Sequence, residues 1–187
     1  NALPALIRRI SCGVIYVSPM MFDRQGVAIR ALGEAIDEAG VPLEEIYSPD
    51  RLRVGEGVTI DVLHPTRFGV LGSDNANSIV LAIEYRGRRI LLTGDLEPPG
   101  LEAVLAEAPW DCDVLLAPHH GSAASNPAGM TAWCTPEWVF VSGSINNRSP
   151  EIERDYRSTG ATVLHGGETG AVTVEIGRHG MRVERFR

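Results

Sequence analysis

The chain has 187 residues, of which 44% are hydrophobic and 22% are charged, and its formal net charge is −7. This balance is typical of a folded globular domain and excludes a disordered, collagenous or coiled-coil protein. The sequence contains no run of about 18 apolar residues, so we predict no membrane-spanning segment within it. The negative charge argues against broad electrostatic binding of nucleic acid, although a bound metal ion reverses the sign locally.

The start of the chain and the three cysteines say little about function. Residues 1–10 predict a short helix, and Asn1-Ala2 is either native or left by an expression tag, so we expect a piece of a longer protein. Cys12, Cys112 and Cys134 include no CxxC pair, which excludes a structural zinc knuckle. We predict that all three are core thiols.

The first half of the chain alternates strand and helix patterns. The predicted elements are a strand over 14–17, a helix over 27–39 that ends at Gly40, a strand over 57–63, and strands over 78–85 and 88–93. Arg86-Gly87 separates the last two strands and predicts a tight hairpin. The polar segment 66–77 predicts a loop.

The second half repeats this alternation. Its predicted elements are a short helix from 98 to 106, a strand over 114–117, a short helix near Met130, a strand over 138–142, a helix over 150–160, and strands over 162–164, 171–176 and 181–186. Strands that alternate with helices and are interrupted by hairpins predict one α/β unit with a mixed sheet. We find no internal repeat and no linker.

Asp95 is the first candidate functional residue. It follows a buried strand and Gly94 directly, which places a carboxylate rigidly at the sheet edge, where it is suited to bind or bridge metal ions. The alternative is an ordinary turn aspartate that bonds to nearby backbone.

The segment His119-His120-Gly121-Ser122 follows the next predicted strand of this kind. Adjacent histidines point in different directions, so one can bind a metal ion while the other contacts substrate or supports the first. Gly121 permits close approach of a ligand, and Ser122 offers a hydroxyl donor. The alternative is a pair of solvated loop histidines.

A third loop, residues 142–148, is small and polar and ends in a cation. Asn146, Asn147 and Arg148 supply donors that suit a phosphate or another anion. A plain polar connection is the alternative. His64 and His165 also end predicted strands, but a lone histidine is more often structural.

The order of these motifs resembles the later part of a metallo-β-lactamase-fold domain. The resemblance rests on Leu92-Thr93-Gly94-Asp95, on Pro118-His119-His120-Gly121-Ser122 and on Gly170-Ala171-Val172. More narrowly, the sequence is similar to the C-terminal soluble domain of ComEC-type competence proteins, which import DNA across bacterial membranes. The segment 78–81, the loop at Asn146-Asn147 and the segment 160–163 also match that family.

The resemblance implies a fold and a site. The fold is a partial α/β/β/α sandwich of mixed sheets with flanking helices, in which residues 1–187 form the later portion of one domain. The site holds two divalent ions, Zn or Mn, with Asp95 as bridging carboxylate and His119 and His120 as the histidine pair, of which we favour His120 as ligand. Asp95 and His119 are the implied catalytic residues. Ser122, Asn146, Asn147 and Arg148 would contact substrate.

Two departures from the family pattern limit this expectation. The family's first metal motif, of the HxHxDH type, is absent and would lie upstream of residue 1, so this fragment alone should bind metal weakly and be inactive. Asn147-Arg148-Ser149-Pro150 stands where relatives often have Gly-His-Pro. The region around Asn75, Asn77 and Ser78 falls where many relatives carry another ligand.

Three functions follow from the resemblance. The first is a metal-dependent nuclease acting on single-stranded DNA, in a domain on the extracytoplasmic side of a multi-pass protein of the bacterial cytoplasmic membrane. Its partners would be the upstream half of the domain and the channel domain. The second is an inactive binding or structural module of the uptake channel. The third is a hydrolase of a small ester or lactone. An exposed inner sheet would also favour a homodimer of the fragment.

Overall fold

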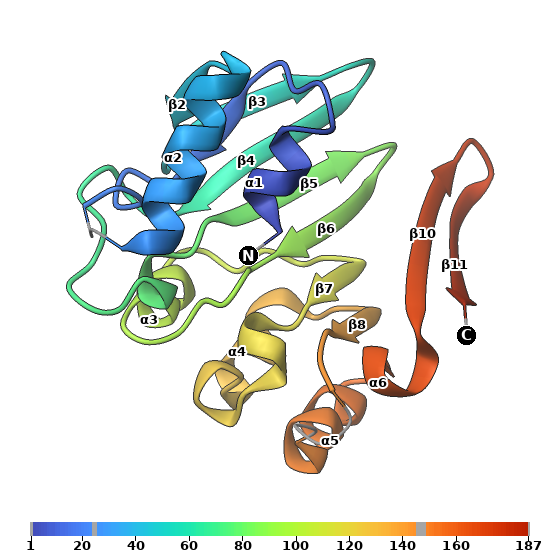
Figure 1. Ribbon diagram of the computed structural model, residues 1–187. Coiled ribbons are helices and arrows are strands. Elements are labelled where there is room, and N and C mark those ends of the chain that lie inside the picture. Colours follow the sequence, from blue (N-terminus) through green and yellow to red (C-terminus); the bar gives the residue numbers. More distant parts are fainter. Residues whose placement is uncertain (1, 24–25, 145–148, 187) are drawn as a thin grey trace.

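The computed structural model describes residues 2–23, 26–144 and 149–186 (Figure 1). The helices are α1 (Leu3–Ile7), α2 (Val27–Ala39), α3 (Gly100–Leu105), α4 (Ala128–Cys134), α5 (Pro150–Ser158) and α6 (Gly166–Thr169). The strands are β1 (Ile15–Val17), β2 (Leu43–Glu45), β3 (Arg51–Val54), β4 (Val58–His64), β5 (Val80–Tyr85), β6 (Arg88–Leu92), β7 (Val114–Leu116), β8 (Trp138–Val141), β9 (Thr162–His165), β10 (Ala171–Gly177) and β11 (Gly180–Phe186). Short 3₁₀ helices are η1 (Asn75–Asn77), η2 (Pro118–Gly121) and η3 (Ala123–Ser125).

Within the described residues, seven strands form one sheet in the order β3-β4-β5-β6-β7-β8-β9. Strands β3 to β6 pair antiparallel, and β6 to β9 pair parallel. In the antiparallel half, short turns join β3 to β4 and β5 to β6, and the longer segment 65–79 joins β4 to β5. In the parallel half, α3, α4 and α5 lie in the connections. The carboxyl ends of β6, β7, β8 and β9 therefore share one edge of the sheet.

The main core lies between this sheet and helices α3, α4 and α5. Alternate residues of the strands point to this side because successive side chains of a strand face opposite ways. The strand residues of the core are Val80, Ala82, Leu91, Leu115, Val139, Val141 and Val163. The helices contribute Leu101, Val104, Met130, Trp133, Cys134, Ile152 and Tyr156.

The opposite side of the sheet carries a second apolar row. Its members stand in register across five strands and are Leu81, Leu92, Leu116, Phe140 and Leu164. Leu164 is buried, but the other side chains of the row are only partly covered. This face of the sheet is therefore apolar without being closed by the described residues.

Two smaller units accompany the main sheet. Near the start of the chain, β1 and β2 pair parallel, and α1 and α2 pack around a small cluster of Ile7, Leu32 and Ile36. At the end, β10 and β11 form an antiparallel hairpin that stands beside the main sheet (Figure 1). None of the helices in the described part of the chain is long and apolar enough to cross a bilayer.

The predicted α/β class with a mixed sheet is confirmed, but some elements differ from the prediction. The helix expected over residues 1–10 covers only Leu3–Ile7. Strands β2 and β3 and helix α6 were not predicted, because each spans three or four residues and is mostly exposed, which leaves no periodic pattern. Cys112 and Cys134 are buried as predicted, whereas Cys12 is only partly buried and is not a core thiol.

Candidate functional site

Loops from two neighbouring parallel strands form the candidate site. Thr93-Gly94-Asp95 follows β6, and Pro118-His119-His120 follows β7. The buried Thr93 hydroxyl donates to the carbonyl of Leu116 at 2.7 Å, and the His119 N–H donates to the carbonyl of Gly94 at 3.1 Å. These two bonds fix the loops against each other at the carboxyl edge of the sheet, where α/β folds place their ligands.

The backbone of the histidine loop adopts a rare conformation. His119 and His120 have φ values of 48° and 54°, and Gly121 follows with φ 77°. Non-glycine residues pay of order 1 kcal/mol for this left-handed region, so it persists only where the surroundings enforce it. Gly121 is also sterically required, because a Cβ atom there would lie 2.8 Å from Cγ1 of Val141.

The side chains of Asn126 and Tyr156 hold this loop from the protein interior. The Asn126 amide donates to the carbonyls of Pro118 at 2.9 Å and Ser122 at 2.7 Å, on either side of the histidines. The Tyr156 hydroxyl of α5 donates to Oδ1 of Asn126 at 2.6 Å. Both side chains are buried, and burial raises the pKa of Tyr156. The network therefore joins α5 to the histidine loop through neutral hydrogen bonds.

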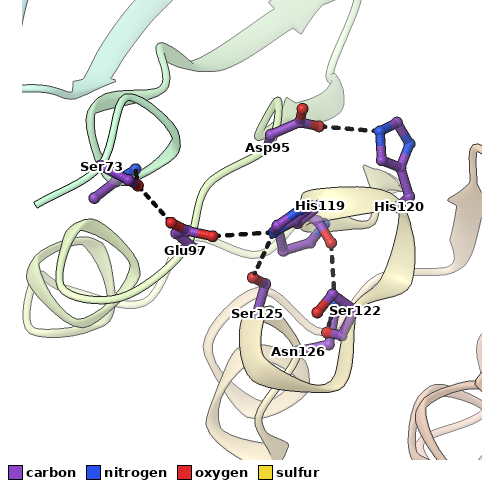
Figure 2. Close-up of polar contacts among 10 residues, drawn as sticks. Ser73, Asp95, Glu97, His119, His120, Ser122, Ser125 and Asn126 are labelled. Atoms are coloured by element: carbon purple, nitrogen blue, oxygen red, sulfur yellow. Dashed lines mark hydrogen bonds and ion pairs between the residues drawn. The ribbon is translucent and has the colours of Figure 1, made fainter.

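His120 faces Asp95 across the two loops (Figure 2). Its Nε2 lies 3.4 Å from Oδ1 of Asp95, and its Nδ1 lies 2.8 Å from the carbonyl of Ser142 after β8. A carbonyl only accepts hydrogen bonds, so Nδ1 carries the proton and donates it. In the neutral ring, Nε2 and the Asp95 oxygen are then both electron-pair donors that a cation between them would join. A ring whose other N–H is held by a backbone carbonyl is typical of histidines that bind metal ions.

His119 points the other way and contacts a residue that the sequence did not single out (Figure 2). Its Nδ1 lies 3.3 Å from Oε2 of Glu97 and 3.5 Å from the Ser125 hydroxyl. The other oxygen of Glu97 accepts from the Ser73 hydroxyl. Because a carboxylate only accepts hydrogen bonds, this contact favours the tautomer with the proton on Nδ1 of His119, which leaves Nε2 open to a substrate. Glu97 was detectable only as a second carboxylate two residues after Asp95.

The donor set fits one side of a divalent-metal site. Carboxylate oxygen and imidazole nitrogen are the ligands that Zn²⁺ and Mn²⁺ accept, and Asp95 and His120 offer one of each. The rings of His119 and His120 are 6.3 Å apart, and they face different carboxylates, His119 facing Glu97 and His120 facing Asp95. Among the described residues, no group of three or more histidine, cysteine or acidic side chains could hold a metal ion.

The remaining predicted residues fall in different places. Ser122 lies in the histidine loop, where its N–H donates to the carbonyl of His119 at 2.9 Å and its side chain is partly exposed. Asn146, Asn147 and Arg148 lie outside the described residues.

Other polar residues at strand ends are engaged in structure. The Asn77 side chain accepts from the Val70 N–H at 2.8 Å and donates to the Val70 carbonyl at 3.0 Å, which holds the preceding loop. His64 is buried and bonds through Nε2 to the Ala76 carbonyl at 2.8 Å. His165 is also buried. Its Nδ1 accepts from the Gly167 N–H, and among the described residues its Nε2 has no partner.

Comparison with known proteins gives two sequence relatives. The chain is 28% identical over 138 residues to "Competence protein ComA" of Neisseria gonorrhoeae, and 34% identical over 116 residues to "ComE operon protein 3" of Bacillus subtilis. These matches cover 71% and 62% of this chain but only 20% and 15% of the relatives, so the chain spans a small part of their length. No protein-family model matches the chain.

Solved structures give weaker likeness. A presumed metal-dependent hydrolase of Parabacteroides distasonis is 12% identical, with a TM-score of 0.48 over 85% of this chain and 78% of that one. A presumed zinc-dependent hydrolase of the metallo-β-lactamase superfamily from Thermotoga maritima is 18% identical, with a TM-score of 0.34 over 62% and 56%. The large mixed sheet with its flanking helices agrees with the predicted α/β fold class, and the sequence relatives are competence proteins of the predicted type.

Proposed function

Because the chain is related to ComEC-type competence proteins, we propose that it is the later portion of a metal-dependent phosphodiesterase domain that acts on DNA during uptake. The observation that carries this proposal is the pair formed by Asp95 and His120. Nε2 of His120 is turned toward the carboxylate by the Ser142 carbonyl, at the sheet edge where ligands bind.

Each residue of the site has a proposed task. Asp95 and His120 would hold divalent ions, with Asp95 as the bridging carboxylate. His119, oriented by Glu97, would give or take a proton at Nε2 beside the scissile bond. Ser122 would contact the substrate from the same loop, and Asn146, Asn147 and Arg148 would bind its phosphates. When bound, the ions would supply an activated water and neutralise phosphoryl charge.

The partly covered apolar row supports the expected domain organisation. Leu81, Leu92, Leu116 and Phe140 form a stripe of the kind that packs against a second sheet about 10 Å away. We assign that second layer to residues of the parent protein upstream of this chain, which would also carry the first metal motif. In the parent, a channel domain in the bacterial membrane would be the neighbour, with this domain on the extracytoplasmic side. Without the upstream layer, two fragments would pair through the same stripe.

The test uses a polypeptide that continues upstream through the first metal motif of the parent. We expect it to cleave end-labelled single-stranded DNA when Mn²⁺ or Zn²⁺ is present and not when the metal is chelated. Asp95→Ala and His120→Ala should each lower the rate at least about 100-fold, because each removes a ligand of the metal site. Asp37→Ala, on the exposed face of α2, is the matched control and should retain full activity.

Three outcomes would contradict the proposal, the first in its choice of ligand and the other two in its reaction. Cleavage that survives Asp95→Ala would place the bridging ligand elsewhere. No cleavage and no metal in the purified polypeptide would leave the binding module of the uptake channel as its function. Turnover of a small ester or lactone, with DNA left intact, would instead favour the small-molecule hydrolase.

A further inference from the structure

Two cysteines stand at the base of the segment that carries the histidine loop. Cys112 precedes β7, which leads into Pro118-His119-His120, and Cys134 is the last residue of α4, which follows that loop. Both are free thiols in this structure, and both are buried in the main core. Neither has a task in the proposed function, which leaves this pair unexplained.

The backbone brings the two residues side by side. The Cys112 N–H donates to the Cys134 carbonyl at 2.9 Å, and the Trp110 N–H donates to the Trp133 carbonyl at 3.0 Å. In paired strands, residues joined by a backbone hydrogen bond have Cα atoms about 5.5 Å apart, and we expect a similar spacing for Cys112 and Cys134. That spacing lies within the range of roughly 4.4–6.8 Å that a disulfide spans between Cα atoms.

The two side chains also lie in the same core cluster. The Cys134 thiol donates to the carbonyl of Met130 at 3.1 Å, and its nearness raises the pKa of the Cys112 thiol. Two neighbouring thiols on backbone segments at this spacing need no large backbone movement to be joined.

We propose that Cys112 and Cys134 form a disulfide that closes the segment 112–134 around the histidine loop. In the first step, one cysteine thiolate attacks a disulfide oxidant, such as oxidised glutathione or a protein disulfide, and displaces one thiolate from it. The second cysteine loses its proton and attacks the mixed disulfide, which releases the other thiol of the oxidant. Two electrons pass from the cysteines to the oxidant, which ends as two thiols.

The buried setting fixes when this reaction occurs. The neighbouring Cys134 thiol, together with burial, raises the pKa of the Cys112 thiol, so the folded reduced protein holds almost no thiolate at this position. The bond therefore forms while the chain is folding and both sulfurs are accessible. Once the core has closed, the same burial keeps reductants away from it.

The experiment refolds the denatured, reduced chain in two buffers, one with a glutathione redox pair and one with a strong dithiol reductant. In the glutathione buffer we expect the mass to fall by about 2 Da. Iodoacetamide in denaturant should then label only Cys12, whereas all three cysteines react in the reduced sample. Peptide mapping should join the peptides that contain Cys112 and Cys134. Closing a loop of this size should raise the melting temperature by about 10 °C.

The chain offers matched controls. Cys12→Ala should still lose about 2 Da in the glutathione buffer and show no thiol that reacts, while Cys134→Ala should show no gain in melting temperature. If Cys134→Ala fails to fold, the labelling of free thiols in the unaltered chain and in Cys12→Ala still shows whether the disulfide forms. Three reactive thiols after refolding in glutathione, or a bond that includes Cys12, would overturn the proposal.

Discussion

At the scale of single residues, Gly100 shows how closely the chain is packed behind the site. A Cβ atom at Gly100 would lie 1.9 Å from the Ala76 carbonyl oxygen and 2.9 Å from Nε2 of His64. Gly100→Ala should therefore displace the His64–Ala76 bond and lower the free energy of unfolding by about 3 kcal/mol.

Gly129 is the matched control for this substitution. It lies inside α4, where an added Cβ would meet only Cδ1 of Leu105 at 3.9 Å. Gly129→Ala should raise the free energy of unfolding by roughly 0.5–1 kcal/mol, because alanine favours helix. Urea denaturation of both variants measures the contrast. Equal effects of the two substitutions would show that the contact with Ala76 relaxes without cost.

His64 gives the protein a dependence on acid that can be assigned to one residue. Burial lowers the pKa of His64, and the hydrogen bond to the Ala76 carbonyl offsets this only in part. The unfolded chain takes up a proton below roughly pH 6.5, whereas the native imidazole stays neutral. The contribution of neutral His64 to the free energy of unfolding is therefore complete above about pH 6.5 and is lost as the pH falls toward the pKa of the folded state.

The measurement compares urea unfolding of the protein and of His64→Gln in neutral and mildly acidic buffer. Glutamine cannot take up the proton, so the variant should lose less stability on acidification than the unaltered chain. An identical loss in both proteins would mean that His64 is not protonated differently in the folded and unfolded states.

At the scale of elements, the bond from Tyr156 to Asn126 couples α5 to the histidine loop. Tyr156→Phe removes the only hydroxyl that donates to Oδ1 of Asn126 among the bonds described and leaves a buried acceptor unpaired. We expect a loss of about 1–3 kcal/mol in the free energy of unfolding. Hydrogen exchange at the Ser122 N–H should also become faster, since that amide closes the loop.

Tyr16→Phe provides the control, because the Tyr16 side chain is exposed. That variant should change stability by less than about 0.5 kcal/mol. If Tyr156→Phe unfolds at lower urea while exchange in the loop stays slow, α5 contributes to the core but does not hold the histidines.

The same scale shows what the sequence could and could not predict. The hairpin at Arg86-Gly87 and the helix that ends at Gly40 were predictable because turn chemistry and periodicity agree there. Asp95, His119 and His120 could be named as candidate site residues because the two short segments that contain them begin directly after buried strands. Glu97 could not be given a role, since its contact with His119 depends on how two separate loops lie against each other.

At the scale of the whole molecule, the α/β class followed from the alternation of strand and helix patterns. The division of the sheet into an antiparallel and a parallel half did not. Hydrophobic runs at β6 and β7 look alike in sequence, although β6 pairs antiparallel with β5 on one side and parallel with β7 on the other. The apolar row of Leu81, Leu92, Leu116 and Phe140 was equally hidden, because register, and not composition, aligns it across the strands.

The change from antiparallel to parallel pairing at β6 also sets an order of folding. Strands β3 and β4, and strands β5 and β6, meet through short turns, and the segment 65–79 joins these two hairpins. Strands β7, β8 and β9 must each wait for an intervening helix to close a longer connection. Contacts between residues near in sequence form sooner, so the antiparallel half should be protected first. Pulse-labelled hydrogen exchange during refolding should find the amides of Ile83 and Leu91 protected before those of Leu116 and Phe140. The segment that carries the histidines would then take shape late in folding, on an antiparallel half of the sheet that already exists.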